Sequence, residues 1–163
     1  MESLNRREIL AVAAAACLCS VAGPAALLAD DTTQPSSQPS TLDVGAKSDY
    51  ATDGITSTWM STNKVAIIRN DNKLYATTAV CTHRGCTVRA PGATTEPDRP
   101  YAFKCPCHGA QFDMDGKVLR GPARKSLARF AISVDSNGHV IVDMSQSFPD
   151  TDWDNPASFV AVS

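Results

Sequence analysis

Two short segments that carry cysteine and histidine constrain the fold of this chain more than any other feature. The first is Cys81-Thr82-His83-Arg84-Gly85-Cys86, and the second is Cys105-Pro106-Cys107-His108-Gly109. Each offers an outer cysteine and a histidine at close spacing, and each also carries a second cysteine. Two thiolates and two imidazoles can bind zinc, or can bind an iron–sulfur cluster in which histidines replace two of the four cysteines. We therefore expect the two segments to meet in space.

The candidate ligands are the outer cysteine and the histidine of each segment, namely Cys81, His83, Cys105 and His108. Cys86 and Cys107 are then spare, one in each segment. A disulfide between them would pin the two segments together. Because two residue types recur at set offsets in both segments, the pattern is a specific signal.

The paired segments resemble the Rieske [2Fe–2S] domain, and more narrowly its disulfide-bearing kind, which is found in cytochrome bc and b6f complexes and in arsenite oxidase. The resemblance covers roughly residues 42–144. It implies one [2Fe–2S] cluster per chain, with cysteines on one iron and histidines on the other. Rieske domains of ring-hydroxylating oxygenases lack the two extra cysteines and fit less well. The implied ligands are Cys81, Cys105, His83 and His108, and the implied disulfide is Cys86–Cys107.

The surroundings of the ligands match the resemblance only in part. Members of the bc type usually have a serine after C-P-C-H-G and a tyrosine two residues later, and their hydroxyls donate hydrogen bonds to cluster and cysteine sulfur. Here those positions are Ala110 and Phe112, so we expect a lower reduction potential. Arg84 stands where a leucine commonly lines a quinol pocket, and a cation there favours a polar or anionic partner. The other residues expected beside the cluster are Gly85, Gly109, Gly121 and Pro122; the last two resemble the family's proline loop.

The globular part is predicted to be all-β. We expect a small antiparallel β-sandwich of Rieske type, with a cluster-binding subdomain of two loops and an N-terminal signal or anchor helix before it. The turn Asn70-Asp71-Asn72 predicts a hairpin, and residues 90–100 are expected to form a surface excursion. The predicted strands are residues 64–69, 73–80, 101–104, 111–113, 117–119, 130–134 and 139–142.

The ends of the chain are predicted to be appendages to a domain at residues 42–144. Residues 1–29 contain Asn5-Arg6-Arg7 before an alanine-rich apolar run, which resembles a twin-arginine export signal. The run over residues 9–29 is long enough, at roughly 30 Å as a helix, to span a membrane, so both an anchored and a cleaved form stay open. Residues 30–41 are polar and predicted to be a flexible linker. Residues 145–163 form an acidic tail, either packed on the sheet through its last apolar residues or used for docking.

The net charge of −2 implies neither nucleic acid nor an anionic surface as a partner.

The chain shows no substrate pocket or acid/base pair, so we expect a one-electron carrier within an oxidoreductase system, on the outer side of the cytoplasmic membrane. Expected partners are a cytochrome b-type or molybdenum-enzyme subunit and a c-type cytochrome, with quinol as a further candidate at a shared site. The alternatives are an arsenite-oxidase-like subunit, a stand-alone exported carrier and, more remotely, a structural zinc module. His139, Trp59 and Trp153 are predicted to be structural.

Overall fold

The computed structural model describes residues 40–90 and 101–162. The predicted signal, nearly all of the linker and most of the predicted excursion lie outside the described residues. The described part is built from antiparallel strands and three short 3-10 turns, which confirms the predicted all-β class. Within these two ranges, no helix has the length and apolar character that a membrane crossing requires.

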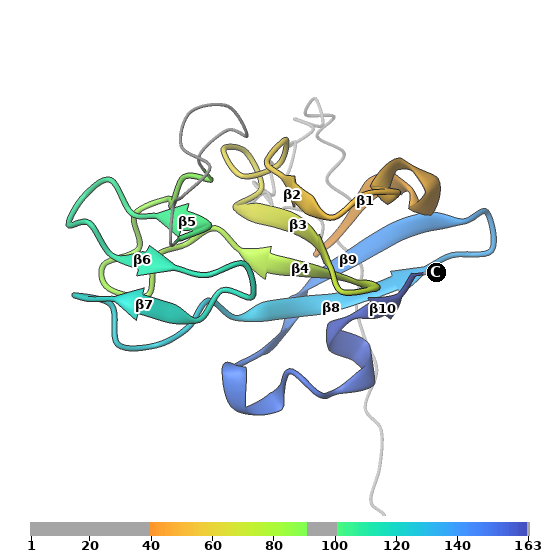
Figure 1. Cartoon of the computed structure of the whole chain (residues 1–163). Coiled ribbons are helices and arrows are strands. Elements are labelled where there is room, and N and C mark those ends of the chain that lie inside the picture. The colour runs from red at the N-terminus through yellow and green to blue at the C-terminus, as the bar shows by residue number, and fades with distance from the viewer. Residues whose placement is uncertain (1–39, 91–100, 163) are drawn as a thin grey trace, which may run out of the picture. The chain divides into compact units, whose positions relative to one another are not determined.

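The strands form a large and a small sheet (Figure 1). The large sheet has the order β1-β9-β8-β4-β3-β2, and β10 also pairs with β4. Its strands are β1 (Thr41–Ala46), β2 (Gly54–Thr56), β3 (Val65–Asn70), β4 (Lys73–Thr78), β8 (Arg129–Val134), β9 (His139–Phe148) and β10 (Val160–Ala161). The small sheet is β5 (Phe103–Lys104), β6 (Gln111–Phe112) and β7 (Val118–Arg120). The 3-10 turns are η1 (Lys47–Tyr50), η2 (Asp150–Asp152) and η3 (Pro156–Ser158).

The predicted hairpin is β3 and β4, which pair antiparallel from Val65 with Thr78 to Asn70 with Lys73. The two residues between them, Asp71 and Asn72, have φ of 50° and 59°. Two successive left-handed residues match the right-handed twist of the flanking strands, and asparagine and aspartate tolerate this conformation better than most side chains. The hairpin ends next to the first ligand-bearing segment and so places it.

Strand β3 is buried on both faces, because its side chains alternate between two apolar cores. Residues 65–68 are all 0% exposed. Val65 and Ile67 pack into the sheet-side core, with residues of β1, β4, β8 and β9. Ala66 and Ile68 pack into the loop-side core, which also contains Cys81 and Cys105. The loops that carry the candidate ligands are thus backed by the same strand that builds the main sheet.

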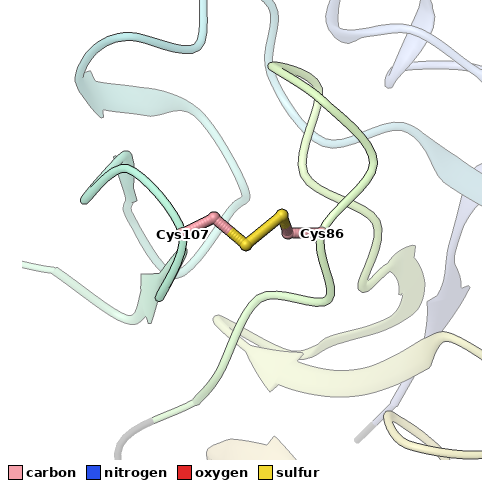
Figure 2. The surroundings of a disulfide bond; sticks show 2 residues. All are labelled: Cys86 and Cys107. Carbon is pink, nitrogen blue, oxygen red and sulfur yellow. A yellow bond between two sulfur atoms is a disulfide. The ribbon is translucent and has the colours of Figure 1, made fainter.

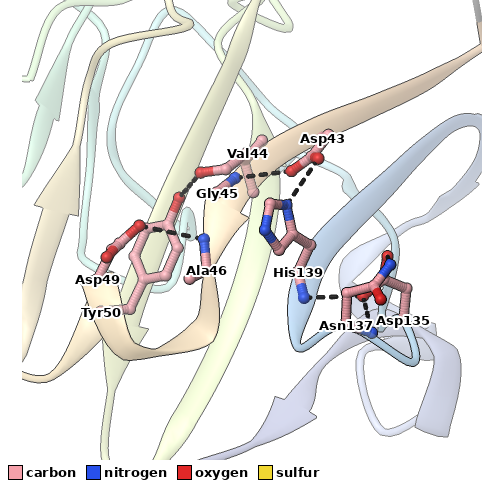
Figure 3. Close-up of polar contacts among 9 residues, drawn as sticks. All are labelled: Asp43, Val44, Gly45, Ala46, Asp49, Tyr50, Asp135, Asn137 and His139. Atoms are coloured by element: carbon pink, nitrogen blue, oxygen red, sulfur yellow. Dashed lines mark hydrogen bonds and ion pairs between the residues drawn. The ribbon is translucent and has the colours of Figure 1, made fainter.

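Strand β1 was not predicted, and it is held to β9 by a contact between residues distant in sequence (Figure 3). Nδ1 of His139 lies 2.8 Å from Oδ2 of Asp43. The Asp43 carboxylate raises the pKa of His139, and hydrogen bonds from the Gly45 backbone and His139 lower the pKa of Asp43. His139 therefore has the structural role that was expected for it.

The C-terminal tail packs on the domain. Strand β9 continues through Phe148, beyond the residue at which the domain was predicted to end. Trp153 is 8% exposed and covers Arg129, whose guanidinium carbon lies 4.3 Å from the tryptophan ring and 3.7 Å from the ring of Tyr75. The last apolar residues lie on the sheet, since β10 pairs with β4.

A polar junction joins the main sheet to the small-sheet region. The Tyr75 hydroxyl donates to Oδ1 of Asp115 at 2.8 Å, and Nη2 of Arg129 lies 3.3 Å from the same oxygen. Burial and the hydrogen bond with Asp115 raise the pKa of Tyr75. Burial lowers the pKa of Arg129, while its neighbours Tyr75 and Asp115 raise it. Asp115 belongs to the turn between β6 and β7, so this one carboxylate links the two sheets.

Candidate metal centre

The first candidate segment is a tight loop that begins at Cys81. The Cys81 N–H donates to the Cys86 carbonyl at 2.8 Å, and the Gly85 N–H donates to the Cys81 carbonyl at 2.9 Å. Gly85 has φ of +75°, a conformation that glycine adopts without strain. The loop is closed by a bridge between Val80 and Thr87.

The second segment repeats the same backbone pattern at the same offsets. The Cys105 N–H donates to the Ala110 carbonyl at 2.8 Å, and the Gly109 N–H donates to the Cys105 carbonyl at 3.0 Å. Gly109 has φ of +74°, almost the value of its counterpart. The two loops therefore have one design, in which the outer cysteine starts the turn and the glycine four residues later closes it.

A disulfide joins the two loops (Figure 2). It links Cys86 to Cys107, with a Cα–Cα distance of 6.6 Å and a sequence separation of 21. The picture shows each cysteine on its own loop, with the bond running across the space between them. The bridge implied by the resemblance is thus present, and it leaves Cys81 and Cys105 as free thiols.

The two free thiols are deeply buried and lie in one cluster of apolar side chains. Cys81 and Cys105 are each 1% exposed. Burial raises the pKa of the Cys81 thiol, while backbone N–H groups of His83 and Arg84, directed at its sulfur, lower it. Such N–H donors would stabilise a thiolate bound to a metal. The apolar core around the sulfurs keeps water away from them.

The two histidine rings are in contact, and both residues are more exposed than the buried thiols. The rings of His83 and His108 have centroids 4.8 Å apart and are nearly perpendicular, at 88°. Burial, His108 and Arg84 all lower the pKa of His83, which favours the neutral imidazole that a metal requires. Nδ1 of His83 is buried and has no hydrogen-bond partner within the described residues.

The residues present fit a [2Fe–2S] cluster. A buried ring nitrogen without a partner is costly unless something binds it, and iron coordination at His83 Nδ1 would satisfy it. Two free thiols and two imidazoles form the donor set of a Rieske centre. Among the described residues, a compact group of metal-binding side chains is Cys86, Cys105 and Cys107, with sulfurs all within 4.8 Å. Two of those sulfurs form the disulfide, so this group is not a site for a single ion.

Two of the residues predicted to lie beside the cluster pack in the same core as the candidate ligand thiols. Ala110 and Phe112 are both 0% exposed and belong to the loop-side core. Neither side chain can donate a hydrogen bond. Pro122 lines a hollow beside His83, and Arg84 is exposed. Gly121 is likewise exposed, directly before Pro122.

Residues 40–131 match the family model of the Rieske [2Fe-2S] domain. The chain belongs to the Rieske [2Fe–2S] domain family. It is a disulfide-bearing Rieske protein, and its cofactor is a [2Fe–2S] cluster.

Several similar proteins are named as iron-sulfur subunits of cytochrome b6-f complexes. The chain is 56% identical over 54 residues to the cytochrome b6-f complex iron-sulfur subunit 1 of Nostoc sp. (strain PCC 7120), which is 33% of this chain and 27% of that protein. It is 40% identical over 89 residues to the cytochrome b6-f complex iron-sulfur subunit of Synechococcus sp. (strain WH7803), which is 53% of this chain and 44% of that protein. The matched part is therefore under half of each of these relatives.

One similar solved structure is the cyanobacterial plasma membrane Rieske protein PetC3 of Synechocystis PCC 6803. Its TM-score is 0.43 and its sequence identity 29%, over 62% of this chain and 97% of that chain.

Sequence reasoning missed a contact that supports the first loop. The Thr82 hydroxyl donates to the Lys125 carbonyl at 2.5 Å, and Arg124 and Lys125 line the hollow beside His83. Thr82 and Lys125 are 43 positions apart in sequence, so no local sequence pattern could indicate their contact.

Proposed function

We propose that Cys81 and Cys105 bind one iron of the cluster and that His83 and His108 bind the other. The observation that carries this assignment is the buried Nδ1 of His83, which has no partner among the described residues, lies next to a second imidazole and is accompanied by two free, buried thiols. The matching loop backbones support it, because each loop then contributes one sulfur and one nitrogen from the same kind of turn.

The protein residues set the charge and the surroundings of the cluster. Two ferric ions, two sulfides, two thiolates and two neutral imidazoles sum to zero, whereas four thiolates would leave two negative charges. The bound cluster takes up and releases one electron, in a range of about −150 to +300 mV for this ligand set. The side chains of Ala110 and Phe112 exclude water without donating hydrogen bonds to sulfur, which favours the lower part of that range.

We propose that the chain passes single electrons from a quinol-oxidising, bc-like complex to a c-type cytochrome or a similar acceptor. The relatives named as cytochrome b6-f complex iron-sulfur subunits support this role. A cytochrome b-type subunit is then the donor-side partner, with quinol at the shared site.

A second candidate is a small Rieske subunit of an arsenite-oxidase-like molybdenum enzyme, or a stand-alone carrier. Arg84 favours it, because this exposed cation occupies a position where the bc type places an apolar residue against quinol. The identity of the donor distinguishes the two: reduction by a quinol analogue in the purified complex supports the bc-like role.

The N-terminal residues support export. We propose that residues 1–29 direct the folded, cluster-loaded chain through the twin-arginine route to the outer side of the cytoplasmic membrane, and that residues 30–41 link it to the domain at residues 42–144. An Arg6→Lys, Arg7→Lys variant should remain in the cytoplasm with its cluster. Export at the wild-type level would contradict the twin-arginine route.

The ligand assignment is tested on the full chain purified without oxygen. We expect a coloured protein and, after reduction, an EPR signal with average g below 2. Cys81→Ser, His83→Ala and Cys105→Ser should each lose both features, and the matched control His139→Gln should keep them. A colourless wild type with one zinc per chain would overturn the proposed function in favour of a zinc module.

A further inference from the structure

The charges of the described residues are segregated, although the chain as a whole is close to neutral. Between β4 and β8, the part that carries both ligand loops and the small sheet, the described residues include seven lysines and arginines but two aspartates, Asp113 and Asp115. The rest of the described residues include five basic side chains and nine aspartates. Among the described residues, the segment between β4 and β8 thus carries a net positive charge and the rest a net negative charge.

Part of this positive charge lies directly beside a candidate ligand. A hollow of about 430 Å³ is lined by Thr82, His83, Pro122, Arg124 and Lys125. Arg124 and Lys125 are exposed, and no acidic side chain is among the described residues that line it. The nearby Asp150 is held by the Ser126 hydroxyl at 2.7 Å.

Two further exposed cations adjoin the lining residues in sequence. Arg84 follows His83 in the first loop, and Arg120 ends β7. Because the cations come from three separate segments, they form a broad surface rather than a pocket around one small anion. A one-sided field of this kind steers an oppositely charged protein toward the site and raises its rate of encounter by roughly 10- to 1,000-fold at low salt.

We propose that the surface formed by Arg84, Arg120, Arg124 and Lys125 around His83 docks the acidic face of a redox protein that accepts the electron. This inference rests on the proposed function and adds the chemistry of the partner. In the docked pair, one electron leaves the reduced cluster and reduces one metal ion of the acceptor. No bond forms or breaks, and the partner's carboxylates face the four cations.

The local field is measured with small oxidants of opposite charge. The cluster-loaded, reduced full chain is mixed in a stopped-flow instrument with trianionic hexacyanoferrate(III) or with tricationic tris(phenanthroline)cobalt(III). Ionic strength is raised from about 0.01 M to about 0.1 M, which shortens the screening length from roughly 30 Å to roughly 10 Å. We expect the rate with the anion to fall and the rate with the cation to rise. If only the net charge of −2 acted, the rate with the anion would rise and the rate with the cation would fall. Observing those two results would overturn the proposal.

A measurement without electron transfer uses hexacyanocobaltate(III), a redox-inert anion of the same charge and shape. In the oxidised, isotopically labelled full chain, we expect its addition to shift the NMR amide signals of Arg120, Arg124 and Lys125. The signals of the control positions Lys47 in η1 and Lys73 at the start of β4, both outside the ligand loops, should stay in place. Equal shifts at both sets of positions would overturn the proposal.

The kind of partner is tested with a lysine-rich c-type cytochrome and the same cytochrome after its lysines are succinylated. The acidic form should accept electrons faster than the native form at low salt. Arg124→Gln with Lys125→Gln should remove most of that preference, and Lys47→Gln with Lys73→Gln, which changes the net charge equally, should keep it. Equal effects of both pairs, or binding to anionic vesicles in place of the acidic cytochrome, would overturn the proposal. A chain that donates no electron to any of these oxidants would instead contradict the proposed function.

Discussion

Replacing Asp115 by asparagine should destabilise the protein more than replacing any other acidic residue of the same region. Asp115 is the charged partner of Arg129, whose side chain is 7% exposed, at 3.3 Å. The same oxygen accepts a hydrogen bond from Tyr75. Asparagine keeps an oxygen for both donors and removes only the negative charge, so the guanidinium remains buried without its paired carboxylate.

The magnitude follows from the exposure of the two partners. Breaking a fully buried ion pair by removing one member costs about 3–5 kcal/mol. Here the Asp115 side chain is 39% exposed, so solvent already screens part of the attraction. The rings of Tyr75 and Trp153 also continue to stabilise the cation. We therefore expect a loss of about 2 kcal/mol, which corresponds to roughly 6–10 °C for a domain of this size.

The assay is guanidinium unfolding of the cluster-loaded full chain without oxygen, followed by circular dichroism and by visible absorption. Asp154→Asn is the matched control, because Asp154 lines the same surface hollow as Asp115 and Arg129. In a double-mutant cycle, Asp115→Asn should cost little once Arg129 is methionine. Equal losses in Asp115→Asn and Asp154→Asn, or strictly additive effects in the cycle, would refute the reasoning.

Three further predictions concern the loops, the cluster environment and β1. Replacing both Cys86 and Cys107 by alanine should lower the free energy of unfolding by about 3 kcal/mol, given their sequence separation of 21, and an unchanged guanidinium midpoint would contradict this. Ala110→Ser combined with Phe112→Tyr should raise the midpoint potential in a redox titration, since each hydroxyl can donate to sulfur; an unchanged potential would dismiss that explanation. The folded state raises the pKa of His139, so the stabilisation by the charged imidazole is complete below its ordinary pKa of 6.5 and disappears as pH rises through the higher folded value. The stability difference between the wild type and His139→Gln should therefore shrink from about pH 6 upward, and a constant difference would exclude this role.

Local sequence patterns were sufficient to predict those features that depend on residues close together in the sequence. Asn70-Asp71-Asn72 predicted the β3–β4 hairpin because its turn needs residues that tolerate positive φ. The spacing of the cysteines and histidines in the two loops also predicted which residues would come together. The shared backbone pattern of the two loops was not visible, since the histidines and second cysteines stand at different offsets in each.

The sequence was not sufficient to predict features that depend on a contact between segments far apart in the chain. Strand β1 has a short alternation in which Leu42 and Val44 face inward, but its partner is β9, and the contact of Asp43 with His139 spans 96 positions. Strand β10 has only two residues, and it is a strand because it pairs with β4. The burial of Trp153 likewise depends on Arg129, which no helical or strand period could indicate.

The double burial of β3 has a consequence for how this protein loses its cofactor. Its successive side chains belong to the two apolar cores in turn. Unfolding of this strand therefore exposes the core around the ligand sulfurs and the core of the main sheet together. Bleaching of the visible colour should then coincide with the loss of β structure in a single transition, with no colourless folded species between. For this protein, colour would serve as a direct reading of the fraction folded.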